Sequence, residues 1–133
     1  MSMKIPEEIK QDFSREPLDP KSLLPDPFDQ FEAWFGQACA ENLPAPNAMC
    51  LATASADGSP TVRTVLLKVY DRDGFVFFTN YGSRKAHQIA ENPRVSLLFS
   101  WFSMGRQVTI TGIAQRIPTA ASLRYFLSRS RGS

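Results

Sequence analysis

Apolar residues recur at helical spacing in the segment that follows Asp26-Pro27. These positions are Phe28, Phe31, Trp34, Phe35 and Ala38. Steps of three and four residues place them on one face of a helix. An acidic residue followed by proline is a favoured helix start, because the carboxylate accepts hydrogen bonds from the free backbone N–H groups of the first turn. The pattern predicts a helix from Asp26 that buries this face in the core.

Five runs downstream are rich in β-branched and aromatic residues and predict strands. They span 48–55, 61–70, 75–79, 95–101 and 107–117. Turn sequences at 56–59 and 71–74, each containing Asp and Gly, separate the first three runs, as is typical of antiparallel hairpins. A short helix is expected over 81–92, with Ser83 near its start and Asn92-Pro93 as its stop, and Pro118 opens a last helix.

These elements predict a mainly β, antiparallel fold with flanking helices. A small barrel is favoured over an open sheet, because closure removes the edge strands that an open sheet exposes. Residues 1–26 are polar and contain prolines at positions 6, 17, 20 and 25. We expect them to form an N-terminal arm on a surface, with residues 27–133 as the folded domain.

Composition narrows the class of protein. The 133 residues are 43% hydrophobic and 21% charged, which fits one domain that buries roughly two-thirds of its unfolded surface. The net charge of +2 is too mild to demand nucleic acid, and the basic residues form no known nucleic-acid motif. No run approaches the ~20 apolar residues of a membrane helix. We expect a cytoplasmic protein without nucleic-acid or membrane partners.

Cysteine and histidine usage excludes several kinds of site. Cys39 and Cys50 have no CxxC spacing and no accompanying histidines, which predicts reduced, buried thiols. His87 is the single histidine, so we expect neither a histidine-based metal site nor a Ser-His-Asp triad. A place on a helix surface is the better interpretation of His87.

Basic residues supply the strongest signal of chemistry. Arg63 and Lys68 stand inside an apolar strand, where burying a charge is costly unless an opposite charge accompanies it. Ser83-Arg84-Lys85 at a helix start offers free backbone amides, a hydroxyl and two cations, which together suit a phosphate. The alternative for that segment is an exposed helix end with solvated charges. Arg63 and Lys68 fall on opposite strand faces unless a bulge intervenes, so they would touch different parts of a ligand, or two ligands.

Three further groups carry weaker signals. The segment 101–104 holds Trp, Phe and Met that could stack on a planar ring, although aromatic residues at a strand end are more often core. Gln107 begins a strand and could donate to a carbonyl. Tyr125, Arg129 and Ser133 recur every four residues, so a continued helix would align them on one face that suits a second phosphate.

Taken in order, these motifs resemble the pyridoxine/pyridoxamine 5′-phosphate oxidase family, the FMN enzymes that make pyridoxal 5′-phosphate. The matching motifs are Asp26-Pro27, Asn47-Ala-Met49, Leu51-Ala-Thr53, 63–68, 77–80, 83–88, Asn92-Pro93, 106–108 and 125–129. The resemblance runs from about Asp26 to the last residue. So many motifs in the same order make coincidence a poor explanation.

The resemblance implies an FMN-binding split β-barrel of about six strands that acts as a homodimer, with one FMN at each end of the subunit interface. The implied FMN ligands of one subunit are Arg63, Thr64, Val65, Leu66, Leu67, Lys68, Phe78, Thr79, Ser83, Arg84 and Lys85. Gln107 would reach FMN from the other subunit. The implied ligands of the substrate phosphate are Lys68, Tyr125, Arg129 and Ser133.

The implied reaction is oxidation of pyridoxamine or pyridoxine 5′-phosphate to pyridoxal 5′-phosphate in vitamin B6 metabolism. In the family the flavin takes a hydride equivalent from C4′ of the substrate, and dioxygen reoxidises the flavin with release of hydrogen peroxide. No side chain of this chain is assigned a catalytic role and no metal is implied, because the cofactor does the redox chemistry while the protein binds and orients.

The chain departs from the family pattern in three places. Segment 11–14 stands where the family arm usually carries an Arg and a Tyr that fold over the substrate, and Met104-Gly105 stands where Leu-Glu is usual. Family members continue well beyond the position of Ser133, so we expect either a fragment or a naturally short relative. Two alternatives to the oxidase therefore stay open: a split-barrel flavin reductase with another substrate, and a non-catalytic module that binds FMN or pyridoxal phosphate.

Overall fold

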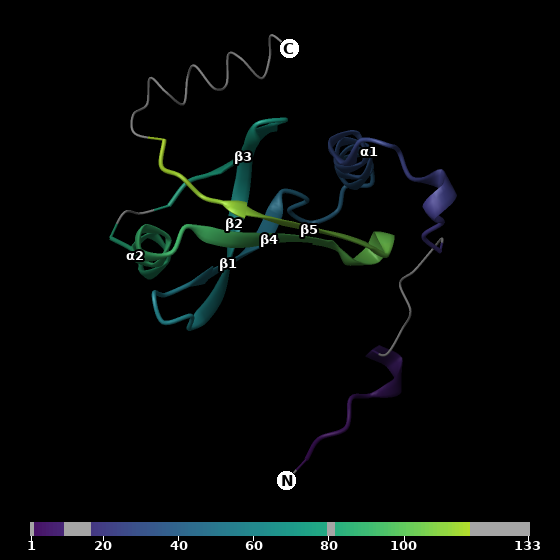
Figure 1. Cartoon of the computed structure of the whole chain (residues 1–133). Helices are drawn as coiled ribbons and strands as arrows, with labels where there is room; N and C mark the ends of the chain where they lie inside the picture. The colour runs from purple at the N-terminus through teal and green to yellow at the C-terminus, as the bar shows by residue number, and fades with distance from the viewer. Residues whose placement is uncertain (1, 10–16, 80–81, 118–133) are drawn as a thin grey trace.

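The computed structural model of the chain describes residues 2–9, 17–79 and 82–117. Within them, the antiparallel strands follow one another in the order β3-β2-β1-β4-β5 and form a curled sheet (Figure 1). The strands are β1 (Ala48–Ala54), β2 (Pro60–Asp71), β3 (Gly74–Phe77), β4 (Arg94–Trp101) and β5 (Arg106–Ile113). The mainly β, antiparallel fold predicted from the sequence is confirmed.

Two α-helices flank the strands in the described part of the chain, α1 (Pro27–Ala40) and α2 (Arg84–Glu91), and Figure 1 shows them toward opposite ends of the strands. Short 3-10 turns complete the elements: η1 (Glu7–Ile9), η2 (Pro20–Ser22) and η3 (Phe102–Met104). The sequence pattern did not predict η3, which joins β4 to β5. None of the helices described is long and apolar enough to cross a membrane.

Helix α1 begins where the sequence predicts. Asp26 is the capping residue: its Oδ1 accepts a hydrogen bond of 2.8 Å from the Phe28 N–H, and Pro27 occupies the first turn. Of the predicted apolar face, Phe31 and Ala38 are 3% and 0% exposed. The remaining three aromatic residues of that face are half-buried. The face therefore packs on the sheet as expected.

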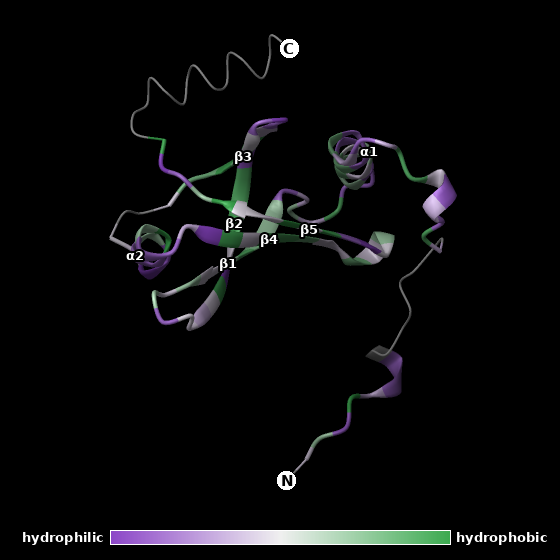
Figure 2. Cartoon of the chain, in the orientation of Figure 1, coloured by the Kyte–Doolittle hydropathy of each residue, from purple (hydrophilic) through white to green (hydrophobic). Residues whose placement is uncertain are grey.

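The core lies between α1 and the inward faces of the central strands. Its strand residues are Met49, Leu51, Val65, Leu67, Leu97, Phe99 and Trp101. On β1 and β2 they stand at alternate positions, as a strand buried on one face requires. Figure 2 shows the hydrophobic residues gathered on the strands, with hydrophilic residues at the β2–β3 turn and along α2. Trp101 and Met104 are both 3% exposed, which confirms the core interpretation of these two residues.

Several predicted boundaries were wrong. Strand β5 ends at Ile113 and not at 117, because its partner β4 begins only at Arg94, after a proline that has no N–H to extend the ladder. The Ala114 N–H donates to the Pro93 carbonyl at 2.8 Å, and the chain leaves the sheet there. Strand β3 stops at Phe77, two residues early. The predicted last helix, from 118 onward, lies outside the described residues.

The two cysteines differ from expectation in burial. Cys39 is exposed and Cys50 is half-buried, and both are free thiols. The prediction of reduced cysteines agrees with this, whereas the prediction that both are buried was wrong. Cys39 follows the buried Ala38 near the end of α1, so it turns toward solvent. His87 is exposed on α2, as predicted.

Candidate anion-binding site

Arg63 points to the inner face of the sheet near the end of β2 that is remote from β3. It stands opposite Leu51 of β1 and shares its strand face with the buried Val65. Its Nη1 donates to the Leu51 carbonyl at 3.0 Å and to Thr53 Oγ1 at 2.7 Å, and its Nη2 donates to Thr61 Oγ1 at 2.5 Å. All of these acceptors are neutral. The guanidinium is thus held firmly, and within the described part of the chain no carboxylate forms an ion pair with it.

Gln88 of α2 completes this cluster from the other side. Its Oε1 accepts hydrogen bonds from Thr53 Oγ1 at 2.5 Å and from Thr61 Oγ1 at 2.6 Å. The Arg63 Nη2 lies 3.5 Å from the same oxygen. Gln88 is 5% exposed and Thr53 is 2% exposed, so the contact is sheltered from water. Helix α2 is therefore fixed to β1 and β2 through polar groups.

The start of α2 faces the same region. Ser83 caps the helix, as predicted: its Oγ accepts from the Ala86 N–H at 3.3 Å and lies 3.3 Å from Thr79 Oγ1. Arg84 is exposed and Lys85 is half-buried in the first turn. Arg84 precedes Gln88 by one helical turn, so the two side chains lie along the same helix face. The partial positive charge of a helix N-terminus adds to these two cations.

Electrostatics link the strand arginine to the helix. Burial lowers the pKa of Arg63 below its ordinary value, and the positive charge of Arg84 lowers this pKa further. Among the residues that the structure describes, ion pairs join Arg72 to Asp26 and Asp29, and no carboxylate pairs with Arg63 or Arg84. Two cations therefore repel each other without an acid between them. An anion placed there would relieve both the repulsion and the cost of burial.

Lys68 lies on the opposite face of β2. It is exposed, whereas Val65 and Leu67 are buried, so the alternation predicted from the spacing of Arg63 and Lys68 is observed. The Lys68 Nζ lies 5.8 Å from the centroid of the Phe78 ring. The β2–β3 pairing shifts register between Leu67 and Val69, which is where Lys68 stands. Lys68 and Phe78 form a second group of predicted ligands, separate from Arg63.

The remaining predicted ligands differ in how they are placed. Side chains of Val65 and Leu67 are part of the core, so only their backbone can face a ligand. Thr64 and Leu66 are exposed on the outer face of β2. Strand β3 pairs with one edge of β2, and this pairing begins only at Leu67. On that edge, the backbone of residues 60–66 has no strand partner in the part of the chain that the structure describes.

Gln107 stands apart from the cluster around Arg63. It is exposed on β5, opposite Ser100 of β4. Tyr125, Arg129 and Ser133, the other predicted ligands of a substrate phosphate, lie outside the described residues. Thr53 and Gln88 stand in motifs that match the family, but sequence reasoning gave no site role to them or to Thr61. Polar residues at inward strand positions, and a glutamine one turn after Arg84, are the signals that could have found them.

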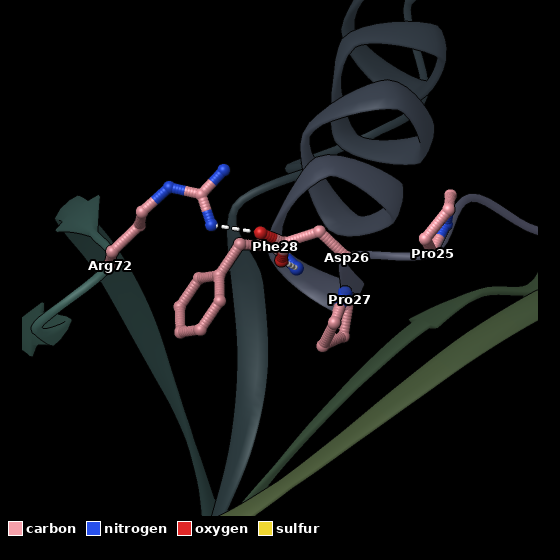
Figure 3. Close-up of a pocket in the computed structure, with 5 residues that line it drawn as sticks. All are labelled: Pro25, Asp26, Pro27, Phe28 and Arg72. Atoms are coloured by element: carbon pink, nitrogen blue, oxygen red, sulfur yellow. Dashed lines mark hydrogen bonds and ion pairs between the residues drawn. The ribbon is translucent and has the colours of Figure 1, made fainter.

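A separate surface pocket of about 530 Å³ lies at the start of α1. It is lined by Pro25, Asp26, Pro27, Phe28 and Arg72. Figure 3 shows Arg72 reaching from the β2–β3 turn toward Asp26, beside the Phe28 ring. Arg72 bonds Asp26 and also Asp29, at 2.8 Å, so its charge is compensated within the chain. Along β2 this pocket is roughly 30 Å from Arg63. Its charges are paired, and it is the weaker candidate for an anion.

Comparison with known proteins identifies relatives over most of the chain. A family model described as pyridoxamine 5′-phosphate oxidase matches residues 35–133. The pyridoxine/pyridoxamine 5′-phosphate oxidase of Crocosphaera subtropica is 57% identical over 125 residues, which cover 94% of this chain and 58% of that protein. The chain thus spans a little over half the length of this curated relative.

Solved structures agree with this match. PhzG from Burkholderia lata 383, in complex with tetrahydrophenazine-1-carboxylic acid, has a TM-score of 0.75 at 28% identity, covering 88% of this chain and 59% of that one. A pyridoxamine 5′-phosphate oxidase-related, FMN binding protein from Nostoc punctiforme has a TM-score of 0.54 at 26% identity, covering 69% of this chain and 48% of that one. These likenesses confirm the split-barrel fold implied by the sequence motifs.

Proposed function

The chain belongs to the pyridoxamine 5′-phosphate oxidase family, and on that premise we propose that it binds FMN and serves the oxidation of pyridoxamine or pyridoxine 5′-phosphate to pyridoxal 5′-phosphate. The observation that carries the proposal is the pair of Arg63 and Arg84, with which no carboxylate of the described residues forms an ion pair. Both belong to the segments that match the family motifs, and the charge of Arg84 lowers the pKa of Arg63, so a phosphate between them would relieve their repulsion.

The donor set fits the phosphate of FMN. A phosphate monoester carries close to two negative charges near neutral pH and accepts several hydrogen bonds. The start of α2 offers the cations of Arg84 and Lys85, the Ser83 hydroxyl and a helix N-terminus, with the Thr79 hydroxyl beside Ser83. Arg63 adds positive charge from the strand. Groups of this kind bind phosphate through charge-assisted hydrogen bonds, which are about twice as strong as neutral ones.

The chain's other residues would orient the rest of the cofactor and the substrate. The edge of β2 over 60–66, which has no strand partner among the described residues, would offer backbone groups to the flavin, and the exposed Phe78 would offer a ring face. Lys68, on the other strand face, would bind the substrate phosphate, together with Tyr125, Arg129 and Ser133 beyond the described residues. Bound FMN would supply the two-electron oxidation of C4′, with dioxygen as the final acceptor.

A homodimer with FMN at its interface is part of the proposal. Exposed apolar side chains support it: Val62 is 65%, Phe102 is 67% and Ile113 is 67% exposed. A dimer interface could bury apolar side chains of this size. In such a dimer, Gln107 of the partner subunit would reach the cofactor. The proposed compartment is the cytoplasm, which the two free thiols support.

A flavin-binding split-barrel protein with another substrate is the second candidate. The likeness to PhzG favours it, because that structure holds tetrahydrophenazine-1-carboxylic acid and matches 88% of this chain. Binding of FMN is common to both candidates. The two candidate functions differ in whether the chain oxidises pyridoxamine or pyridoxine 5′-phosphate.

The test has two parts. The first is a titration of FMN and of riboflavin, which lacks the phosphate, into the protein, the Arg84→Ala variant and the Arg94→Ala control. Arg94 is also an exposed arginine, but it lies at the start of β4. We expect Arg84→Ala to weaken FMN about 10–100-fold, since a hydrogen bond to a charged group contributes about 1.5–3 kcal/mol. The control should bind FMN as the unmodified chain does. Equal FMN affinity in all three proteins would contradict the phosphate site.

The second part is anaerobic addition of pyridoxamine 5′-phosphate to the FMN-loaded protein while the visible absorbance of the flavin is followed. Bleaching that recovers on admission of air is expected of the oxidase. Flavin that stays oxidised would refute the oxidase proposal for this chain and leave the flavin-binding module with another substrate, or with no substrate.

A further inference from the structure

We infer that Gln88 is a positioning residue for the cofactor phosphate: through the hydroxyls of Thr53 and Thr61, it sets the orientation of the Arg63 guanidinium. The inference rests on the proposed function, because it takes the anion beside Arg63 to be the phosphate of FMN. It adds a residue whose role is to hold a phosphate-binding side chain rather than to contact the ligand.

The hydrogen bonds that join Arg63, the two threonines and Gln88 have directions that follow from their chemistry, whereas the two hydroxyls, 3.3 Å apart, could donate either way to each other. A guanidinium can only donate, and the carbonyl oxygen of a glutamine side chain can only accept. Each threonine hydroxyl has one hydrogen, which it gives to Gln88 Oε1 at 2.5 Å from Thr53 and at 2.6 Å from Thr61. The lone pairs of both hydroxyls are then turned toward Arg63, which donates to them at 2.7 and 2.5 Å.

The opposite orientation of the Gln88 amide would break this arrangement. Its NH₂ group would then donate to the two hydroxyls, which already accept from Arg63. One hydroxyl could then donate to the other, 3.3 Å away, but the second hydroxyl hydrogen would have to find another acceptor at a site where Thr53 is 2% exposed. Buried donors without acceptors are costly, so the amide oxygen must face the threonines. Gln88 thereby fixes both hydroxyls and, through them, both Nη atoms of Arg63.

The same residue ties the helix to the strand. Gln88 lies one turn after Arg84, on the helix whose first turn holds Ser83 and Lys85. Its Oε1 also lies 3.5 Å from the Arg63 Nη2. The distance between Arg63 on the strand and the cations of the first helical turn therefore depends on the position of the Gln88 side chain. A phosphate that binds both groups needs that distance to be fixed in advance.

Positioning and simple packing predict different results. A methionine in place of Gln88 has the same unbranched shape and would keep the packing, but it leaves both hydroxyls without their acceptor. A glutamate would still accept from both hydroxyls, but its negative charge would compete with the phosphate for Arg63. Both changes should weaken the binding of the ligand's phosphate and leave the binding of the flavin ring system unaffected.

The experiment measures FMN and riboflavin affinity in parallel for the full chain, Gln88→Met, Gln88→Glu and the control Gln37→Met on the exposed face of α1. Riboflavin differs from FMN only in lacking the phosphate, so the ratio of the two affinities reports on the phosphate site. We expect Gln88→Met to lower FMN affinity about 10-fold and Gln88→Glu more, with riboflavin affinity unchanged and the control equal to the unmodified chain. The far-ultraviolet circular dichroism and Tm of each variant verify that it folds. Thr61→Val, at a half-buried position, gives a second route to the same loss of orientation if Gln88→Met does not fold.

The outcomes separate the inference from its premise. An unmodified chain that binds FMN no better than riboflavin would overturn the phosphate site and this inference with it. An unmodified chain that prefers FMN, with that preference undiminished in the Gln88 and Thr61 variants, would overturn the inference alone. Equal losses of FMN and riboflavin affinity would assign Gln88 to packing and would also overturn it.

Discussion

Replacement of Phe31 by alanine tests the packing of α1 on the sheet. Phe31 is 3% exposed and belongs to the core cluster. Its ring centroid lies 5.0 Å from those of Tyr70 and Phe99 and 5.2 Å from that of Phe75. In each case the rings meet edge to face, a geometry that favours aromatic pairs beyond the area they bury. One side chain thus connects α1 to β2, β3 and β4.

The expected loss follows from this burial. Truncation of a buried phenylalanine to alanine costs about 3–5 kcal/mol, the sum of lost transfer free energy and the cavity left behind. A value of about 4 kcal/mol is expected here, because the surrounding rings are fixed by one another and cannot fill the space. A domain of this kind has a free energy of unfolding of about 5–15 kcal/mol, so the change removes a large fraction of it. The corresponding fall in Tm is roughly 12–20 °C.

The assay is urea unfolding of the unmodified chain, Phe31→Ala and Leu18→Ala at one protein concentration, followed by circular dichroism. Leu18→Ala truncates an apolar side chain that is 54% exposed, and it should change the free energy of unfolding by about 0.5 kcal/mol or less. A loss below about 1 kcal/mol for Phe31→Ala, or losses of equal size in the two variants, would refute the placement of this ring in the core.

Two further predictions concern local backbone and charge. Gly105 closes η3 with φ 67° and ψ 30°, a left-handed conformation, so Gly105→Ala should destabilise the chain by about 1–2 kcal/mol in urea unfolding, whereas Gly112→Ala, at a strand position with open space around it, should not. Equal effects of the two changes would contradict the left-handed turn. Hydrogen bonds from the Ser55 hydroxyl and the Ser59 N–H lower the pKa of Asp57 to about 2 from its ordinary 3.8. The stabilising effect of the Asp57 carboxylate should therefore be complete above about pH 4 and be lost as the pH falls toward 2; an NMR titration of its carboxyl carbon with a midpoint near 4 would contradict these bonds.

Local sequence signals were enough to predict most of the sheet. The turn sequence at 71–74 contains the hairpin between β2 and β3, and the Asp26-Pro27 pair marks the start of α1. Strand ends were less predictable, because they depend on the partner strand. No proline or glycine interrupts the chain between Ile113 and Pro118, yet β5 stops with β4, whose own start is set by Pro93. Pairing across the sheet outweighed β propensity there.

The candidate site was also predictable only in part from the sequence. The alternation of side chains along a strand predicted that Arg63 and Lys68 face opposite sides of β2. The capping role of Ser83 followed from its place before a helix. The contact of Gln88 with two threonines could not be predicted, since 35 residues separate Gln88 from Thr53 along the chain. Burial of Cys39 was predicted from residue type, which says little about the outward face of a helix end.

The cluster around Arg63 is costly to the isolated fold, and this supports a binding role. The neutral members satisfy one another: both threonine hydroxyls and the Gln88 oxygen have partners at 2.5–2.7 Å. Hydrogen bonding to neutral groups does not remove the charge, and the lowered pKa of Arg63 reflects its burial and its repulsion by Arg84. An apolar residue at this inward strand position would avoid both penalties, and a nearby carboxylate would offset them. Arg63 is a fixed, partly buried cation that has no acid partner among the described residues and is held by neutral groups. Such a cation is suited to receive an anion from outside, and binding of that anion would stabilise the folded chain.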